Sequence, residues 1–311
     1  MTKRLLVVGL GKMGGHHLRA IQESGLPVIA DGVNPSDSTE AIEFLLSRGG
    51  LYFSRLDEAL SRHHYDGAIV SATVSAHFDS TQKLLCAEIP TLLEKPMGGK
   101  VAGWLELLQL AREKETILLP GFTEASHFAW GRVVDLLPEV GRVRAVKTRR
   151  VGPRWWRPKG VDSLSDLAIH DLEHITSLFP DLEWKLGGDL DQELSRLRME
   201  PQNSPLFVRG ALVELTAGWG DFEDGARSIE IEGERGAIFV DWATGELRFC
   251  LKDREGNLSR ENVEAFPNNP LVRQLLLFLS PSKALLLQRQ KSATEAMQLL
   301  ERVLNRLQTN D

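Results

Sequence analysis

The sequence is short of the residues that build disulfide scaffolds and thiolate metal centres. It has two cysteines, Cys86 and Cys250, which lie far apart in the chain. Two distant thiols make neither a disulfide framework nor a metal cluster, so we expect both to be reduced in a cytoplasm. No stretch approaches the roughly 20 apolar residues that span a bilayer. The short run LLVVGL near the start is followed at once by Lys12, which argues against a signal peptide. We therefore expect no membrane partner.

An excess of positive charge is also missing. The chain has 37 Lys and Arg against 43 Asp and Glu, a net charge of -6. This balance argues against nucleic acid as a main partner. Basic side chains gather only locally, where they could bind an anionic small molecule: Arg149, Arg150, Arg154 and Arg157. With 42% hydrophobic and 26% charged residues, the 311-residue chain has an ordinary globular composition and room for about two domains.

Residues 1–121 alternate short apolar runs with helical patterns. The apolar runs are 4–10, 26–31, 67–72, 90–95 and 116–121, and the helical patterns are 13–24, 36–48, 77–88 and 101–115. This alternation predicts a parallel sheet with helices on both faces. Because the runs are apolar throughout, we expect the strands to be buried on both sides.

After residue 121 the pattern changes. Helical periodicity occurs at 124–138, 165–179, 271–279 and 288–308, and strand-like alternation at 143–151, 206–217, 227–234, 236–242 and 246–252. Glycine-containing turns join the later strands, as expected for antiparallel pairs. We predict a second domain over 122–311, of α+β class, with a large open, mostly antiparallel sheet that helices cover on one side. Its broad open face favours a homodimer or a homotetramer.

A glycine-rich loop joins the first apolar run to the first helical pattern. Gly9, Gly11 and Gly14 form G-x-G-x-x-G around Lys12 and Met13. The first glycine permits a tight turn, the second lets backbone approach a pyrophosphate, and the third lets helix and strand pack closely. The helix N-terminus adds free N–H groups and a positive dipole end. These residues predict dinucleotide binding by a Rossmann fold over 1–121.

The next strand should end beside the ribose of that dinucleotide. Asp31 lies near the offset of about 20 residues at which an acid binds ribose hydroxyls. Asn34 could take this role instead, and Asp31 could be an ordinary turn residue. No Arg or Lys occurs between Asp31 and Glu43 to hold a 2′-phosphate. The sequence thus favours NAD, with NADP as an alternative.

The stretch SDLAIHDLEH concentrates titratable groups on a predicted helix. Asp166, His170 and His174 are spaced four apart and so share one helix face. One interpretation is a helix start capped by Ser163 or Ser165. The other is a catalytic face, with Asp171 and Glu173 toward solvent or in local caps and with His174 packing. The context H-E-x-x-H is missing, so we expect no metal.

Four segments in order carry a family resemblance. They are GLGKMGGHHLR (9–19), VSATVSAH (70–77), LLEKPM (92–97) and DLAIHD (166–171). Together they resemble the glucose–fructose oxidoreductase, inositol dehydrogenase and MocA family of nicotinamide-dependent dehydrogenases. Residues 229–242 and 270–279 also look like that family's second domain. The resemblance implies hydride transfer between a sugar, polyol or nucleotide-sugar hydroxyl and NAD(P), with Lys95, Asp166 and His170 as catalytic residues.

The chemistry of these side chains agrees with that role. Lys95 follows a strand's carboxyl end, where open α/β sheets bind ligands, and its ammonium could stabilise alkoxide character. His170 could take the substrate proton while Asp166 holds its ring or a substrate hydroxyl. Alternatively Lys95, with its pKa lowered by burial, could be the proton acceptor. A cis peptide bond between Lys95 and Pro96 is a further hypothesis.

Several other residues should line the cofactor. We expect Ala72, Thr73 and His77 beside the nicotinamide, together with Glu94 and Lys95. The alternative for His77 is a place in the first turn of a helix capped by Ser75. His17 should pack in the first helix near the glycine loop.

The segment RRVGPRWWRPKGVDSLSDLAIHD (149–171) resembles the family branch that oxidises the 3-hydroxyl of UDP-N-acetylglucosamine-type sugars. Arg150, Arg154 and Arg157 could bind a diphosphate, while Trp155 and Trp156 stack on a sugar or base. The alternative is a surface loop packed against a partner subunit.

One segment departs from that branch. Where the branch has Glu-Arg-Phe-Asn-Pro, this chain has Glu124 followed by Ala-Ser-His-Phe. Glu124 remains a candidate substrate ligand, and a simpler sugar or a polyol fits equally. Two other functions stay open: a glycosidase that uses NAD transiently, and a regulatory protein that binds a cofactor without chemistry.

Overall fold

The computed structural model describes residues 2–36, 39–157, 162–191, 193–253, 255–257 and 261–309. The chain forms two compact units. The first contains Met1–Thr123 and Leu271–Thr294, and the second contains Glu124–Pro270 and Glu295–Asp311.

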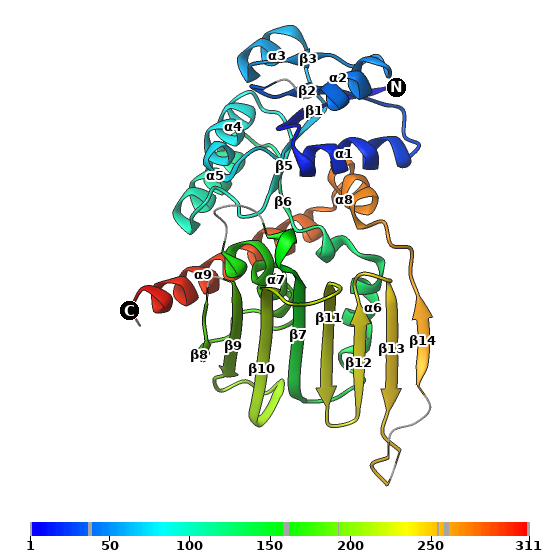
Figure 1. Ribbon diagram of the computed structural model, residues 1–311, viewed down its shortest axis with the longest axis vertical. Coiled ribbons are helices and arrows are strands. Elements are labelled where there is room, and N and C mark those ends of the chain that lie inside the picture. Colours follow the sequence, from blue (N-terminus) through cyan, green and yellow to red (C-terminus); the bar gives the residue numbers. More distant parts are fainter. Residues whose placement is uncertain are drawn as a thin grey trace. The chain divides into compact units, whose positions relative to one another are not determined.

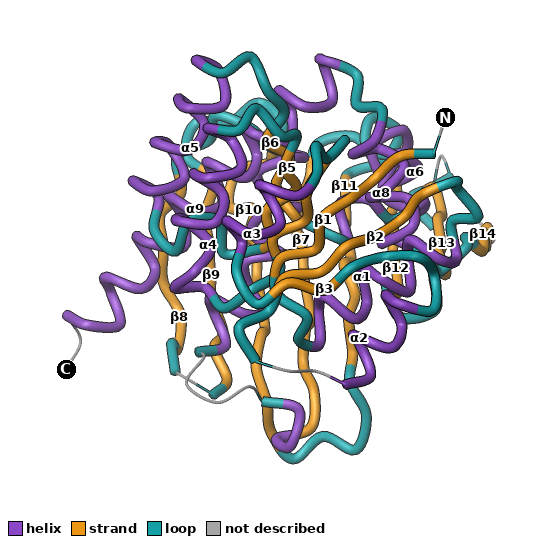
Figure 2. Tube along the Cα trace, turned by 90° about the horizontal axis from the view of Figure 1, so that it is seen from above, coloured by secondary structure: helices purple, strands orange, loops and turns teal. Residues whose placement is uncertain are grey.

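The first unit is built on a parallel six-stranded sheet in the order β3-β2-β1-β4-β5-β6. In Figure 2 the strands β1, β2 and β3 lie side by side. The strand order reverses between β1 and β4, the feature of a doubly wound fold. The strands are β1 (Lys3–Val8), β2 (Val28–Val33), β3 (Tyr52–Phe53), β4 (Gly67–Val70), β5 (Thr91–Glu94) and β6 (Leu118–Gly121). The helices between them are α1 (Lys12–Glu23), α2 (Thr39–Leu46), α3 (Leu56–Arg62), α4 (Val74–Cys86) and α5 (Val101–Glu113).

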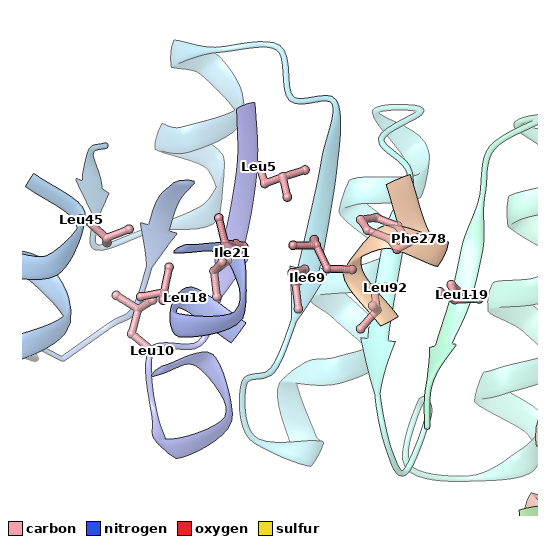
Figure 3. Packing of buried hydrophobic residues seen from close by; sticks show 11 residues of the cluster. Leu5, Leu10, Leu18, Ile21, Leu45, Ile69, Leu92, Leu119 and Phe278 are labelled. Atoms are coloured by element: carbon pink, nitrogen blue, oxygen red, sulfur yellow. The ribbon is translucent and has the colours of Figure 1, made fainter. Parts of the chain in front are cut away.

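The central strands of this sheet are buried on both faces, as their unbroken apolar runs predict. Every residue of β4 and β5 is buried. Figure 3 shows Leu5, Ile69 and Leu92 in one apolar cluster with Phe278 of α8 (Pro270–Leu279). The sequence assigned 271–294 to the second domain. The structure instead places Leu271–Thr294 in the first unit, because the apolar face of α8 packs on this sheet.

The second unit contains a mixed eight-stranded sheet in the order β14-β13-β12-β11-β7-β10-β9-β8 (Figure 1). The pair β7 and β10 is parallel, and the other neighbours are antiparallel. The strands are β7 (Val143–Pro153), β8 (Trp184–Asp189), β9 (Leu194–Pro201), β10 (Phe207–Gly220), β11 (Ala226–Gly233), β12 (Gly236–Asp241), β13 (Glu246–Leu251) and β14 (Asn262–Ala265). The helices are α6 (Phe128–Leu136), α7 (Ile169–Leu178) and part of α9 (Lys283–Thr309).

Helices cover one face of this sheet, and the other face is open. Along β11 and β12, Ile229, Ile231, Ile238 and Val240 are fully buried, while the alternate side chains keep solvent exposure. A π-helical turn, Leu164–Ala168, packs on β7 and β10, and α6 packs on β12. The expected fold class is thereby confirmed for both units.

The sequence analysis did not predict five elements: β3, α3, β8, β9 and β14. In β9 the alternation of buried and exposed residues was readable from LSRLRMEP, whereas β3 has only two residues. Among the described residues, no helix is both long and apolar enough to cross a membrane. Likewise, no group of three or more His, Cys, Asp or Glu within the described ranges could hold a metal ion.

Candidate functional site

In the first unit, the candidate cofactor residues meet at one edge of the sheet. Because β1, β2, β4 and β5 are parallel, their carboxyl ends lie on the same side. Gly9 follows β1, Asn34 follows β2, Ala72 follows β4 and Lys95 follows β5. The backbone N–H of Gly9 donates to the carbonyl of Val33 over 2.8 Å, and this hydrogen bond joins the carboxyl ends of β1 and β2.

The three glycines of the loop serve three different needs. Gly9 has φ +91°, and a Cβ there would collide with the backbone of Ala72. A Cβ on Gly14 would collide with the carbonyl oxygen of Gly9. At Gly11, by contrast, no described atom outside the adjoining residues lies within 4 Å of a Cβ position. Two glycines are therefore required by the protein's own packing, and the third leaves open space above the loop.

That open space fits the pyrophosphate of a dinucleotide. Gly11 is the N-cap of α1, and no described side chain caps the helix there. The first turn holds no acidic residue, so its N–H groups and positive dipole end are ready for phosphate oxygens. Lys12 is exposed and Met13 is half-buried beside them.

Asp31 does not have the role that its offset suggested. Its side chain is fully buried in β2. Arg4 donates to both carboxylate oxygens, at 2.7 and 2.8 Å, and Tyr65 donates to one at 3.1 Å. Burial and the neighbouring Asp31 carboxylate raise the pKa of Tyr65, so its hydroxyl remains a donor. The prediction that Asp31 binds ribose is wrong, because its carboxylate has no accessible surface.

Asn34 occupies the position that Asp31 does not. It directly follows β2, and its Oδ1 accepts the backbone N–H of Leu10 in the glycine loop at 3.2 Å. Its Nδ2 donates to Ser36, and its backbone carbonyl accepts the hydroxyl of Tyr52 at 2.7 Å. Asn34 therefore places a neutral amide, and no carboxylate, next to the glycine loop at the end of β2.

His77 lies in the first turn of α4, whose N-cap is Thr73 and not Ser75. Its Nε2 is 3.0 Å from the carbonyl oxygen of Ala72, and its Nδ1 is 3.3 Å from that of Pro96. Burial lowers the pKa of His77, so one ring nitrogen donates, and the shorter contact identifies Nε2. His77 ties the loops after β4 and β5 together instead of offering its ring to a ligand.

Lys95 is anchored by the residues on either side of it. Glu94 is buried and its Oε1 pairs with Nε2 of buried His17 in α1 at 2.8 Å. The packing role expected for His17 is confirmed. The peptide bond between Lys95 and Pro96 is cis, as hypothesised. Lys95 itself is half-buried at the same sheet edge as the glycine loop.

In the second unit, Asp166 and His170 lie where a π-helical turn enters α7. Asp166 is in the turn Leu164–Ala168, and His170 is the second residue of α7. Both remain half-exposed, whereas all residues from Asp171 to Thr176 are buried. Single π-helical turns within helices frequently mark functional sites. Ser163 is the N-cap residue of this turn, as predicted, but its side chain makes no capping hydrogen bond. The Oδ1 of Asp162 instead accepts the N–H of Ser165 at 2.8 Å.

The acidic residues after His170 contradict the expectation that they face solvent. Asp171 and Glu173 are buried, at 0% and 1% exposure. His174 is buried too, and its ring stacks on Trp130 with centroids 4.4 Å apart and lies 4.9 Å from Trp242. The packing role of His174 is confirmed, while Asp171 belongs to an ion cluster beneath the helix.

That cluster also contains two predicted substrate ligands. The guanidinium of Arg150, in β7, donates to both carboxylate oxygens of Glu124. It also donates to Asp171, at 3.0 and 3.3 Å. All three side chains are buried, so the prediction that Arg150 and Glu124 bind substrate directly is wrong. Arg150 shares the inward face of β7 with Val146, and this alternation was the signal that sequence reasoning missed.

The two carboxyl groups of this cluster have pKa values that are shifted in opposite directions. Burial alone would raise the pKa of Glu124, but the guanidinium of Arg150 outweighs it and holds that pKa well below its usual range. Burial raises the pKa of Asp171 to about 6 despite the same guanidinium. The two carboxylates raise the pKa of Arg150 in spite of its burial, so it stays charged.

The remaining predicted substrate ligands lie after β7. Glu193 accepts from both Arg154 and Arg157, the latter at 2.8 Å. Trp155 is 81% exposed, and the side chain of Trp156 lies outside the described residues. Arg149 points to the open face of the sheet, with its guanidinium 5.3 Å from the ring of Phe222. The four arginines of this segment therefore do not form one basic cluster.

Comparison with known proteins shows a similarity of the first unit to one family. Residues 3–122 match the oxidoreductase family GFO_IDH_MocA, described by its NAD-binding Rossmann fold. An uncharacterized oxidoreductase of Synechocystis sp. is 27% identical over 56% of this chain and 50% of its own length. The dTDP-3,4-didehydro-2,6-dideoxy-α-D-glucose 3-reductase of Streptomyces violaceoruber is 30% identical over 70% of this chain and 61% of its own. These matches thus span between half and two thirds of each relative.

Solved structures share the whole fold. A UDP-N-acetylglucosamine 3-dehydrogenase from Acidithiobacillus ferrooxidans has a TM-score of 0.77 at 19% identity, with 96% of both chains covered. A 3-ketoreductase from Actinomadura kijaniata, in complex with NADP and TDP-benzene, has a TM-score of 0.76 at 17% identity, covering 97% of this chain and 96% of its own. The uncapped glycine loop and the Lys95–Pro96 segment both lie within the residues that match this family. Residues 3–122 are therefore similar to the glucose–fructose oxidoreductase, inositol dehydrogenase and MocA family of NAD-binding Rossmann folds.

Proposed function

We propose that this protein is an NAD(P)-dependent oxidoreductase that moves a hydride between a hydroxyl-bearing carbon of a sugar and the nicotinamide. The observation that carries the proposal is the carboxyl edge of the first sheet, where an open, uncapped glycine loop and half-buried Lys95 follow neighbouring strands. The match of residues 3–122 to a family with an NAD-binding Rossmann fold supports the cofactor class.

The proposed chemistry divides between the two units. Oxidation of an alcohol removes a hydride from carbon and a proton from oxygen, and the bound dinucleotide supplies the hydride acceptor. Lys95 holds the hydroxyl oxygen and stabilises its developing negative charge. His170 takes the proton, and Asp166, four residues before it, orients the imidazole or a second hydroxyl. The half-exposure of Asp166 and His170, next to the buried residues Asp171 to Thr176, supports these roles.

Lys95→Ala and His170→Ala test this assignment. The full chain is screened with NAD and NADP against sugars, polyols and nucleotide sugars, with absorbance of the reduced nicotinamide as the readout. We expect each variant to lose at least ~10²-fold in kcat, because each removes a group that acts in the transition state. Dinucleotide affinity, measured by calorimetry, should stay nearly unchanged.

Three results would contradict the assignment. Near-normal kcat in either variant would remove that residue from the chemistry. Hydrolysis of a glycoside without accumulation of reduced cofactor would favour a glycosidase-type relative. Dinucleotide binding with no turnover on any substrate class would favour a regulatory protein.

We propose a nucleotide sugar as the substrate class. Arg154 and Arg157 lie together at the exposed end of β7, where both are paired with Glu193, and Trp155 offers an exposed ring beside them. Two guanidinium groups match a diphosphate, and an indole matches a base or sugar ring. The similarity to a dTDP-sugar reductase supports this choice. A kcat/KM for free sugars equal to that for nucleotide sugars would contradict it.

We propose that a second copy of the chain covers the open face of the eight-stranded sheet. Phe239 lies on that face, in a depression of about 430 Å³ lined by Arg149, Arg196 and Glu230. Strands β7 and β9 contribute mainly cations, although Glu214 of β10 pairs with Arg198. Strands β11 to β13 contribute mainly carboxylates, although Arg248 of β13 pairs with Glu246 and covers the ring of Phe239. A two-fold axis that lies between the two sheets and runs parallel to the strands sets each half against its opposite half. The cations are Lys147, Arg149, Arg196 and Arg198, and the carboxylates are Glu230, Glu232, Asp241 and Glu246.

The double variant Glu230→Lys with Glu232→Lys tests this interface. Light scattering after size exclusion should give at least a dimer of the 34.7 kDa wild-type chain and a monomer of the variant. Glu234→Gln, which alters only an exposed pair with Arg142, is the matched control and should stay assembled. A monomeric wild type, or a variant that stays assembled, would contradict this interface.

We also propose a reducing cytoplasmic location, in keeping with two free cysteines.

A further inference from the structure

The second unit has an ion cluster, defined as Glu124, Arg150 and Asp171, beneath the start of α7. It joins three elements: the 3-10 turn Glu124–Ser126, strand β7 and helix α7. Their side chains keep at most 10% exposure. The guanidinium binds both carboxylates in a two-pronged manner, which fixes rotation as well as distance.

Stability alone is a weak reason for such a cluster. Removing three charged groups from water costs more than well-packed apolar side chains would. One guanidinium also faces two carboxylates, which leaves an excess negative charge when both are ionised. What the arrangement does provide is a fixed position for the first turn of α7. Asp171 is its buried anchor, and the adjacent His170 is half-exposed.

We propose that this ion cluster positions His170 and sets the charge behind its imidazole, so that Glu124, Arg150 and Asp171 are positioning residues for proton transfer. The inference rests on the proposed function, in which His170 takes the substrate proton. None of the three needs to touch substrate or cofactor for this role.

The charge of the cluster changes near neutral pH. Burial raises the pKa of Asp171 to about 6. Arg150 and Thr148 face it from β7, and His170 and His174 lie on its own helix. Glu124 faces the same guanidinium, and Arg227 of β11 approaches Glu124 at 4.0 Å. With a proton on Asp171 the cluster is neutral, and without it the cluster carries one net negative charge. That charge favours the imidazolium form of His170, so the two titrations are coupled.

NMR of the histidines in the full chain tests, without any substrate, whether the charge of the ion cluster acts on His170. Protein labelled with ¹⁵N-histidine is titrated from pH 5 to 9, and the signal of His170 is assigned with His170→Asn. In Asp171→Asn, we expect the midpoint of His170 to fall by at least about 0.5 pH units, because a nearby negative charge is lost. Glu234→Gln, the exposed control, should leave the midpoint unchanged. An unchanged midpoint in Asp171→Asn would overturn the electrostatic part.

Kinetics test the positioning part. Asp171→Asn should lose at least about 10-fold in kcat, with the KM for the dinucleotide unchanged and with the acidic limb of its pH profile moved as the NMR midpoint moves. Arg150→Lys keeps the charge but loses the fork, so kcat should fall while the His170 midpoint stays within about 0.2 of wild type. Full activity in both variants would overturn the proposal.

Two features keep these outcomes separate from other failures. Asp171→Asn imitates the protonated state of Asp171 that the wild type adopts below pH 6, so we expect this variant to fold. Circular dichroism is measured first to check that it does. If the wild type oxidises no sugar, the proposed function fails, while the NMR titration still decides the electrostatic role. If the wild type is active and both variants match it, only the cluster's role fails.

Discussion

Asn34 follows β2 beside the glycine loop, and we propose that it takes the position at which an acidic side chain would discriminate between the two nicotinamide dinucleotides. A carboxylate at this sheet edge binds the ribose hydroxyls of NAD and repels the 2′-phosphate of NADP. The carboxylate of β2, Asp31, is instead bound by Arg4 and Tyr65 inside the unit. A neutral amide at this position would leave NADP acceptable.

The substitution Asn34→Asp should therefore shift the cofactor preference toward NAD. We expect the ratio of kcat/KM for NAD to that for NADP to rise at least ~10-fold, because the new charge repels the 2′-phosphate. Its Oδ1 can still accept the N–H of Leu10, whereas the donation from Nδ2 to the carbonyl of Ser36 is lost, so thermal unfolding is measured alongside to check the fold. As a control, Asp31→Asn should lower the melting temperature and leave the ratio unchanged. A ratio that responds to Asp31→Asn instead would return the ribose role to Asp31.

Individual side chains show where sequence reasoning succeeds and where it stops. The cis bond at Lys95 and the packing of His17 and His174 followed from local context and were predicted. The partners of Asp31 come from β1 and from the loop before β4, and their approach depends on strand register, which the sequence does not state. The burial of Arg150 was accessible in principle, because alternation along β7 puts it on the inward face.

At the scale of elements, the glycine loop separates packing from ligand binding. Gly14→Ala places a methyl group against the carbonyl of Gly9, so we expect lower stability and at least ~10-fold weaker dinucleotide binding. Gly11→Ala meets only open space in the protein, so the melting temperature should be unchanged while binding weakens. Thermal unfolding and calorimetry measure the two effects. Equal melting temperatures and equal affinities in both variants would contradict this division of roles.

The elements themselves were largely predictable, and their irregularities were not. Long apolar runs and strong periodicity identified β1, β4 and β5 and the helices α1 and α5 to within a few residues. The π-helical turn before α7 was read as ordinary helix, because its sequence has the same periodicity. The difference matters to function, since Asp166 lies in that turn and His170 lies just after it.

At the scale of the whole molecule, the features behind the proposed function are divided between two compact units. Dinucleotide-binding features belong to the first unit, and the residues of the π-helical turn and α7 belong to the second. The boundary after Thr123 follows from the change in pattern near residue 121. The return of Leu271–Thr294 to the first unit could not be predicted, because an amphipathic helix does not specify which core it will cover.

The central claim is that Lys95 and His170 act on one hydroxyl group. It is tested most directly by a crystal structure of the full chain with a nicotinamide dinucleotide and a nucleotide sugar bound together. We expect the Nζ of Lys95 and one imidazole nitrogen of His170 to lie within about 3.2 Å of the same sugar oxygen, with its carbon facing the nicotinamide. A bound sugar whose reacting hydroxyl contacts neither side chain would contradict the account.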